Sequence, residues 1–152
     1  MAFYDAVIVD FQIEELKGLE DALDNMINRA DDLSTIMNRV GRQAWRDTMT
    51  RFDNEVNPEG VSWVPLSPFT RQLYEKKHIT HVKLLHNTGR LRGSINYEVY
   101  SDSFEIFSTC PYAETHQQGS GQVPRRQFLG FTDDDVLYIA EVLADYAIGR
   151  GY

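Results

Sequence analysis

A run of apolar side chains at helical spacing between residues 33 and 52 constrains the fold of this chain more than any other feature. An amphipathic helix of this length must bury its apolar face against other elements, so the chain needs a core on at least one side of it. Asp31 and Asp32 precede the run, where they either interrupt an earlier helix or cap this one. The stripe comprises Leu33, Ile36, Met37, Val40 and Ala44, continued by Trp45, Met49 and Phe52.

Shorter patterns predict the elements that surround this helix. Residues 1–13 contain Val7-Ile8-Val9, which indicates a strand or an extended arm. Leucines at three- and four-residue spacing predict another helix from Glu14 to Ile27. A short helix is expected from Ser67 or Pro68 to about Lys77, and residues 89–93 form a turn or a single helical turn.

The second half of the chain predicts a β-hairpin and a final helix. Alternating apolar residues over 95–99 and 104–107, with a tight turn at 101–103, indicate two antiparallel strands. Thr132 caps the last helix, whose first turn holds three aspartates where the helix dipole favours them. Its apolar stripe comprises Val136, Ile139, Ala140, Leu143, Tyr146 and Ala147.

The fold class is therefore α+β, with long N-terminal helices and a C-terminal helix packed on a small antiparallel β-sheet. With 152 residues and no internal repeat, the chain is expected to form a single domain over residues 1–152. Its one cysteine excludes an internal disulfide framework and suits a reducing cytoplasm. We expect a soluble protein, without a signal peptide or a contact with membranes.

Charge is distributed unevenly along the chain. Residues 1–35 hold nine acidic and two basic side chains, residues 36–130 hold nine acidic and twelve basic ones, and residues 131–152 hold five acidic and one basic. The net charge of −8 disfavours a protein whose main task is to grip nucleic acid. An acidic–basic–acidic chain can instead pair with itself or with further copies.

Two long loops are expected to make assembly contacts. The loop over residues 54–67 carries Trp63, Val64 and Leu66, which must be buried either in their own domain or against a partner. Residues 117–126 have the composition of a mobile loop, and we expect the wider segment 117–130 to become ordered on a neighbouring subunit, on DNA or on another ring protein. Gln117, Gln118, Arg125, Arg126 and Phe128 are its candidate contact residues.

Other constellations are weak indicators of chemistry. Four histidines, His78, His81, His86 and His116, have no cysteine pair nearby. We therefore interpret them as polar groups at the surface or at an interface rather than as ligands of a zinc site. Cys110 and His116 match no catalytic signature. We expect no cofactor and no bound metal.

Three arginines share one face of the long helix. Arg39, Arg42 and Arg46 are spaced so that they contact either phosphate or an acidic neighbour, or form a solvated face. The acidic residues Glu20, Asp24 and Asp31 of the preceding helix are candidates for the neighbour, within one subunit or between subunits. A DNA-binding assembly factor that uses these arginines with Arg125 and Arg126 is the alternative function.

Five short motifs occur in order along the chain. They are Arg51-Phe52, Pro58-x-Gly60-x-x-Trp63-x-Pro65-Leu66-Ser67-x-x-Thr70, Leu85-x-x-Thr88-Gly89-x-Leu91-x-x-Ser94, Tyr112-Ala113-x-x-His116-Gln117-x-Gly119 and Arg126-x-Phe128-Leu129-Gly130. This series resembles the phage virion morphogenesis family, the tail-completion proteins of P2-like and Mu-like phages. The resemblance runs from about residue 35 to residue 145.

This resemblance implies a structural virion protein rather than an enzyme. Such a protein acts late in assembly in the host cytoplasm, at the neck or the top of the tail, so that heads and tails can join. It implies a homo-oligomeric ring, often a hexamer, stacked on other neck and tail proteins such as the tail tube, the sheath and the connector or portal adaptor. DNA would pass through the lumen without specific binding.

Overall fold

The computed structural model describes residues 7–12, 32–80 and 82–147, which form an α+β fold as predicted. Three strands, β1 (Val7–Gln12), β2 (Ile95–Val99) and β3 (Ser103–Ser108), make an antiparallel sheet with β3 in the centre. The predicted N-terminal strand is thus confirmed as an edge strand, with Val7 opposite Ser108 and Gln12 opposite Ser103. The helix expected from Glu14 to Ile27 lies outside the described residues.

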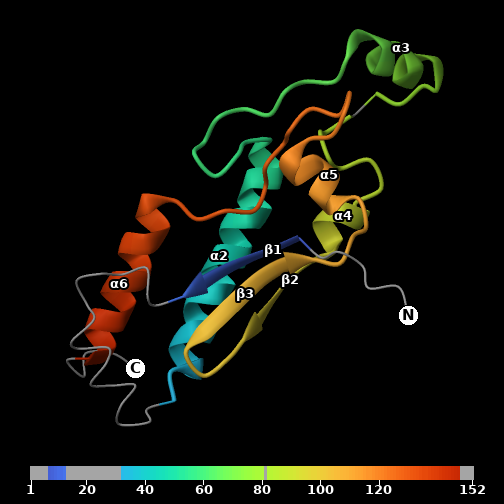
Figure 1. Cartoon of the computed structure of the whole chain (residues 1–152). Helices are drawn as coiled ribbons and strands as arrows, with labels where there is room; N and C mark the ends of the chain where they lie inside the picture. The colour runs from blue at the N-terminus through green and yellow to red at the C-terminus, as the bar shows by residue number, and fades with distance from the viewer. Residues whose placement is uncertain (1–6, 13–31, 81, 148–152) are drawn as a thin grey trace, which may run out of the picture.

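The long helix α2 (Ser34–Asn54) crosses one face of the sheet, and α6 (Asp133–Ala147) packs beside it (Figure 1). The predicted stripe is buried at Leu33, Ile36, Met37, Val40, Met49 and Phe52, and half-buried at Ala44 and Trp45. Asp32 accepts a hydrogen bond from the backbone N–H of Ser34 at 2.8 Å, so it acts at the start of this helix.

Two apolar clusters lie along α2. The first joins its N-terminal half to Phe104 of β3 and to Ile139, Val142 and Leu143 of α6. Gly41 brings the helix close to the sheet, because a Cβ there would lie 2.9 Å from Cδ2 of Tyr97. The second cluster joins the C-terminal half of α2 to β3 and to the loops on either side of α3 and α5.

Three short helices complete the described fold. They are α3 (Pro68–Lys76), α4 (Arg90–Gly93) and α5 (Ala113–Gln118). The first two agree with the predicted segments. Ser67 caps α3 by accepting the N–H of Thr70, and Pro68 occupies the first helical position. Helix α3 stands away from the sheet, at the end of the molecule opposite α6 (Figure 1).

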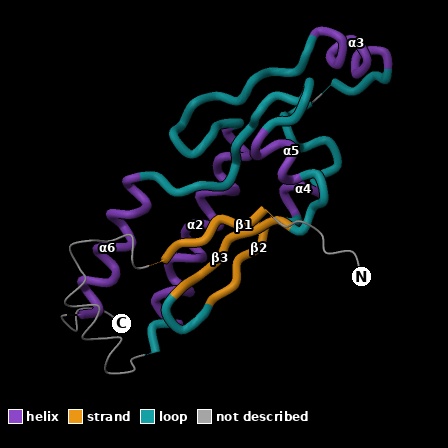
Figure 2. The backbone as a smooth tube through the Cα atoms, in the orientation of Figure 1, coloured by secondary structure: helices purple, strands orange, loops and turns teal. Residues whose placement is uncertain are grey.

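The predicted loop boundaries need two corrections. Helix α2 continues through Asn54, so the first loop begins at Glu55. Residues 117 and 118 belong to α5, and the loop after them is held at Arg126, whose N–H donates to the carbonyl of His116 at 2.7 Å. Figure 2 shows the two long loops, one leading to α3 and the other from α5 to α6, running side by side.

Candidate assembly site

Trp63 lies inside the subunit, at the base of the loop that leads to α3. It is 5% exposed, and its indole N–H donates a hydrogen bond to the carbonyl of Gln127 at 2.8 Å. Its ring meets Phe52 edge to face, with ring centroids 5.5 Å apart. Of the two alternatives for this residue, burial within its own domain is the one observed.

Arg126 holds the same loop from the other side. Its Nε donates to the carbonyl of Val64 at 2.7 Å, and its Nη2 donates to the carbonyl of Pro65 at 3.3 Å. The side chain is buried, at 6% exposure. Two backbone carbonyls of the first loop therefore depend on a guanidinium from the second.

Gln117 fixes the second loop through three buried hydrogen bonds. Its amide nitrogen donates to the carbonyl of Leu129 at 2.7 Å. Its Oε1 accepts the backbone N–H groups of Phe128 and Leu129, at 3.0 and 3.1 Å. The Gln117 side chain thus makes the hydrogen bonds to this short extended segment that a neighbouring strand would otherwise make.

Arg51 connects α2, the second loop and α6. Its Nη1 donates to the carbonyl of Gly130 at 2.8 Å, and its Nη2 lies 3.3 Å from the carboxylate of Asp135. Burial lowers the pKa of the Arg51 guanidinium, and the Asp135 and Asp47 carboxylates oppose that shift. The sequence indicated Arg51 only as part of a motif and gave no indication of this role for Asp135.

We call these mutually supporting side chains the internal hub: Arg51, Trp63, Gln117, Arg126 and Phe128. Gly130 belongs beside it, because a Cβ at that position would lie 2.8 Å from Cγ of Pro58, and its φ is +155°. Much of the motif series that suggested the family therefore forms a single intramolecular structure that positions two loops.

The hub corrects part of the predicted contact surface. Trp63, Gln117, Arg126 and Phe128 are candidate contacts with a partner in the sequence analysis, and the structure buries all four inside their own subunit. The physical reason is that two long loops crossing near the core need partners for their buried backbone groups. Gln118 and Arg125, beside the buried members, are exposed.

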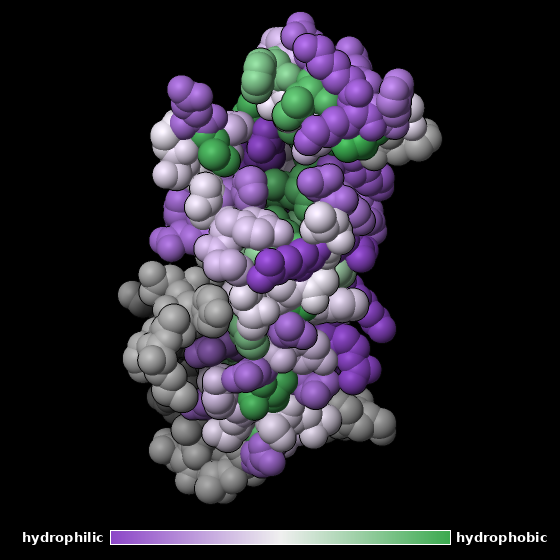
Figure 3. All heavy atoms as spheres, turned by 90° about the vertical axis from the view of Figure 1, so that its right-hand side faces the viewer, coloured by the Kyte–Doolittle hydropathy of each residue, from purple (hydrophilic) through white to green (hydrophobic). Residues whose placement is uncertain are grey.

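The exposed part of the first loop continues into a projecting segment, which we define as residues 61–80. None of the residues of α3 is buried, and the apolar side chains of the segment gather at one end of the molecule (Figure 3). Leu66 is half-buried and packs against the second apolar cluster. The exposed fractions are 62% for Val61, 50% for Val64, 75% for Phe69, 40% for Leu73 and 38% for Ile79.

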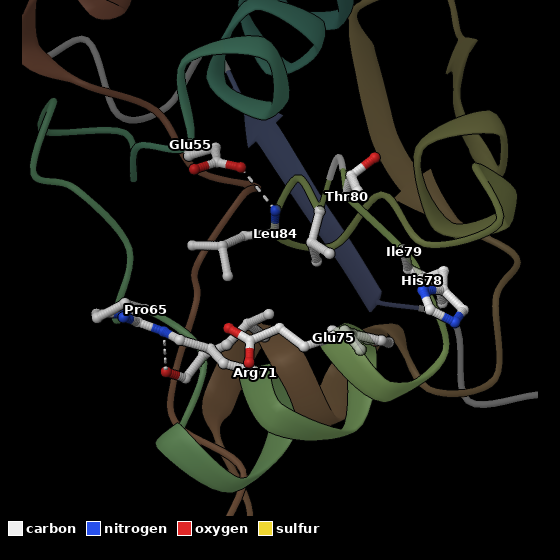
Figure 4. A pocket seen from close by; sticks show the side chains of 11 residues that line it. Glu55, Pro65, Arg71, Glu75, His78, Ile79, Thr80 and Leu84 are labelled. Atoms are coloured by element: carbon white, nitrogen blue, oxygen red, sulfur yellow. Dashed lines mark hydrogen bonds between the residues drawn. The ribbon is translucent and has the colours of Figure 1, made fainter.

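A groove of about 640 Å³ lies between the projecting segment and the body. Glu55 accepts the backbone N–H of Leu84 at 2.6 Å on one wall, and Arg71 donates from Nε to the carbonyl of Leu66 at 3.1 Å on the other (Figure 4). The groove is lined by aliphatic and aromatic side chains together with both signs of charge. Such a lining suits contact with a protein surface.

The basic face of α2 is a separate surface. Arg39, Arg42 and Arg46 are all exposed and border a shallow hollow of about 720 Å³ together with Val99 and Tyr138. Arg42 donates to the Asn38 side chain at 3.1 Å. Within the part of the chain that the structure describes, none of the three arginines has a carboxylate partner. The acidic residues suggested as their neighbours, Glu20, Asp24 and Asp31, lie outside the described residues.

The histidines do not converge in the described ranges. Among residues 7–12, 32–80 and 82–147, no group of three or more His, Cys, Asp or Glu side chains could hold a metal ion, and His81 lies outside these ranges. His116 packs edge to face on Tyr112, with ring centroids 5.9 Å apart. Burial and the nearby Arg126 lower the pKa of His116. Cys110 is buried, at 2% exposure.

Comparison with known proteins agrees with the motif series. The model of the phage virion morphogenesis family matches residues 14–147, and the chain belongs to this family. No curated protein and no solved structure matches the chain. Its role is accordingly structural or in assembly, in a protein associated with the virion. No helix of the described residues is both long and apolar enough to cross a membrane.

Proposed function

As a member of the phage virion morphogenesis family, this chain is, we propose, a tail-completion or tail-terminating protein that forms a ring at the head–tail junction. In this proposal several copies close around the DNA channel, and the ring presents one face to the tail and the other to the head. It carries out no catalysis, and its work is to offer a surface on which finished parts can join. The partners are further copies and other neck and tail proteins.

The projecting segment is the observation that supports the proposal most directly. Monomeric soluble proteins rarely leave a large contiguous apolar surface in water, because such surface gains free energy by being covered. Here five large apolar side chains are exposed on one segment, while the hub fixes its base on the body. Because the base of the projection is already held by hydrogen bonds, less conformational entropy is lost there when the projection docks on a partner.

The experiment is complementation of a phage that lacks this gene. Under the proposal, the defective phage accumulates filled heads and separate tails, and the protein supplied from a plasmid restores joined particles seen by electron microscopy. Labelled protein should lie at the upper end of the tail. Joined, infectious particles without the protein would contradict the proposal, as would a label confined to another part of the virion.

A DNA-binding assembly factor is the second candidate, and one observation favours it. Arg39, Arg42 and Arg46 form an exposed basic row without carboxylate partners in the described part of the chain. Phosphate contacts of this kind give salt-dependent, sequence-independent binding. Retardation of duplex DNA at low salt, lost in the Arg39→Glu/Arg46→Glu variant, would support this candidate, and the absence of retardation would dismiss it.

A further inference from the structure

The outer face of α3 is both apolar and basic. Phe69 and Leu73 are four residues apart and Lys76 follows three residues later, so the three side chains lie on one side of the helix. All are exposed, as is Lys77 at the end of the helix. We call these four residues the α3 stripe. An exposed apolar row that ends in two lysines suits a surface that binds a partner with apolar and acidic side chains.

The outer face of α6 has the opposite charge. Asp134, Leu137, Glu141 and Asp145 are spaced by three, four and four residues, which places them on one side of this helix. All four are exposed, and Leu137 is 62% exposed in the middle of the row. We call these residues the α6 stripe. Like the α3 stripe, it combines exposed apolar and charged side chains, with carboxylates in place of lysines, and it spans residues 134–145 where the α3 stripe spans residues 69–77.

The two stripes of one chain cannot meet. Helix α3 lies at one end of the molecule and α6 at the other, with the sheet and α2 between them (Figure 1). Two complementary surfaces at opposite ends of a subunit suit a head-to-tail contact, in which each copy offers one surface to the copy before it and the other to the copy after it. Contacts of this heterologous kind generate rings when the rotation closes.

We propose that the α3 stripe of one copy docks on the α6 stripe of the next. This inference rests on the proposed ring and assigns its subunit interface to two particular surfaces. Phe69, Leu73 and Leu137 supply the apolar centre, and Lys76 and Lys77 meet the carboxylates at the rim. Charge complementarity sets the partner and the direction of the contact more than its strength.

Cysteine crosslinking tests which surfaces meet. The Leu73→Cys and Leu137→Cys variants are mixed and oxidised, with the buried native Cys110 left in place because a buried thiol reacts slowly. We expect the mixed disulfide to form at least about tenfold faster than in a mixture of Leu73→Cys with the exposed control variant Gln122→Cys, since an interface holds the paired thiols within bonding distance. Each variant alone should crosslink slowly, because the contact is not between identical surfaces.

The assay is run in solution at the highest soluble concentration and again on purified tails. An oligomer that forms without preference for the Leu73–Leu137 pair overturns the assignment. A chain that stays monomeric in solution and shows no preferred pair on tails overturns it as well. The wild-type chain reports any background from Cys110.

Charge reversal provides a second and independent test. Lys76→Glu/Lys77→Glu and Glu141→Lys/Asp145→Lys should each weaken self-association by at least about tenfold, or about 1.4 kcal/mol. Combining all four substitutions in one chain should restore association, because every copy then carries both reversed surfaces. Arg39→Glu/Arg46→Glu, which changes the net charge of an exposed helix face by as much as Lys76→Glu/Lys77→Glu does, is the matched control for that variant and should leave association unchanged.

These outcomes separate the interface from the proposed function. A complementing protein whose rings survive all the charge reversals would retain the function and lose this interface. Crosslinking at the predicted pair in a protein that does not join heads to tails would retain the interface and lose the function. Loss of duplex-DNA retardation in Lys76→Glu/Lys77→Glu, with crosslinking at the Leu73–Leu137 pair unchanged, would show that the lysines serve nucleic acid and would overturn their place in the interface.

Discussion

At the scale of single residues, Trp63 is the residue on which the contribution of the hub to stability can be measured most directly. Replacing it with alanine removes a buried ring and its hydrogen bond to Gln127, so the free energy of unfolding should fall by roughly 3–5 kcal/mol. Trp63→Phe keeps most of the volume and should cost less. Urea denaturation measures both. A Trp63→Ala protein with wild-type stability would place the ring outside the core.

Gln117 and Gln118 form a matched pair for the second loop. Gln117→Ala leaves the N–H groups of Phe128 and Leu129 buried without their acceptor, which should lower the free energy of unfolding by roughly 2 kcal/mol or more. Gln118 is exposed, so Gln118→Ala should change it by less than about 0.5 kcal/mol. Thermal and urea denaturation measure both variants. Equal losses of stability from Gln117→Ala and Gln118→Ala would contradict the assigned role of Gln117.

His116 should make the subunit sensitive to mild acid. Its folded-state pKa is lowered from 6.5 by burial and by Arg126, and its buried Nδ1 has no hydrogen-bond partner among the residues that the structure describes. Well above pH 6.5 the ring is neutral in both the folded and the unfolded state. As pH falls below 6.5, the unfolded chain binds the proton first, so the free energy of unfolding decreases until the folded-state pKa is reached.

Nuclear magnetic resonance titration of the His116 ring checks this directly. The midpoint should lie below 6.5 in the folded protein, and His116→Gln should reduce the loss of stability on acidification. A midpoint at or above 6.5 would show that the ring is solvated or paired with an anion.

At the scale of elements, α6 begins with a reciprocal cap that can be tested alone. The Thr132 hydroxyl accepts the N–H of Asp135 at 3.1 Å, and the Asp135 carboxylate accepts the N–H of Thr132 at 2.7 Å. Thr132→Ala should lower the free energy of unfolding by about 1 kcal/mol, whereas Thr132→Ser, which keeps the hydroxyl, should have a smaller effect. Calorimetry measures both variants. If Thr132→Ala and Thr132→Ser lose the same stability, the methyl group of Thr132 rather than its capping hydroxyl is responsible.

Most of the helices and strands of this fold could be predicted from local sequence patterns. Helices α2, α3 and α6 were found because apolar spacing and capping residues act within a few positions of one another. The hairpin of β2 and β3 followed from strict alternation and a short turn. Val142 of α6 was missed, because it lies at the edge of the stripe and is buried by α2 packing against it.

The hub could not be predicted in the same way. Trp63 and Gln127 are 64 residues apart, and Arg51 and Gly130 are 79 apart, so no local spacing reports the contacts. The partners are also backbone carbonyls, which every residue carries and no sequence pattern marks. The available signal for the hub was the presence of polar residues such as Gln117 and Arg126 beside apolar residues in the motifs. From the sequence alone, these polar side chains are more simply interpreted as surface contacts.

At the scale of the whole molecule, the proposed assembly surface is separate from the residues that form the core. The hub and the two apolar clusters are buried, while Phe69 and Leu73 are 75% and 40% exposed on the projecting segment. Exposed side chains contribute little to the stability of the isolated subunit. A protein divided in this way should tolerate polar substitutions on the projecting segment without unfolding and lose only its ability to associate.

The Phe69→Ser/Leu73→Ser variant should therefore keep its free energy of unfolding within about 0.5 kcal/mol of wild type and fail to complement a phage that lacks the gene. The control is Leu129→Ser in the buried second cluster, which should lose stability and activity together because a fully buried apolar group is replaced by a polar one. Urea denaturation and phage titre are measured on the same preparations. Full complementation by Phe69→Ser/Leu73→Ser would mean that the projecting segment is not an assembly surface, whereas a large loss of stability would mean that α3 packs more closely in solution than its exposure indicates.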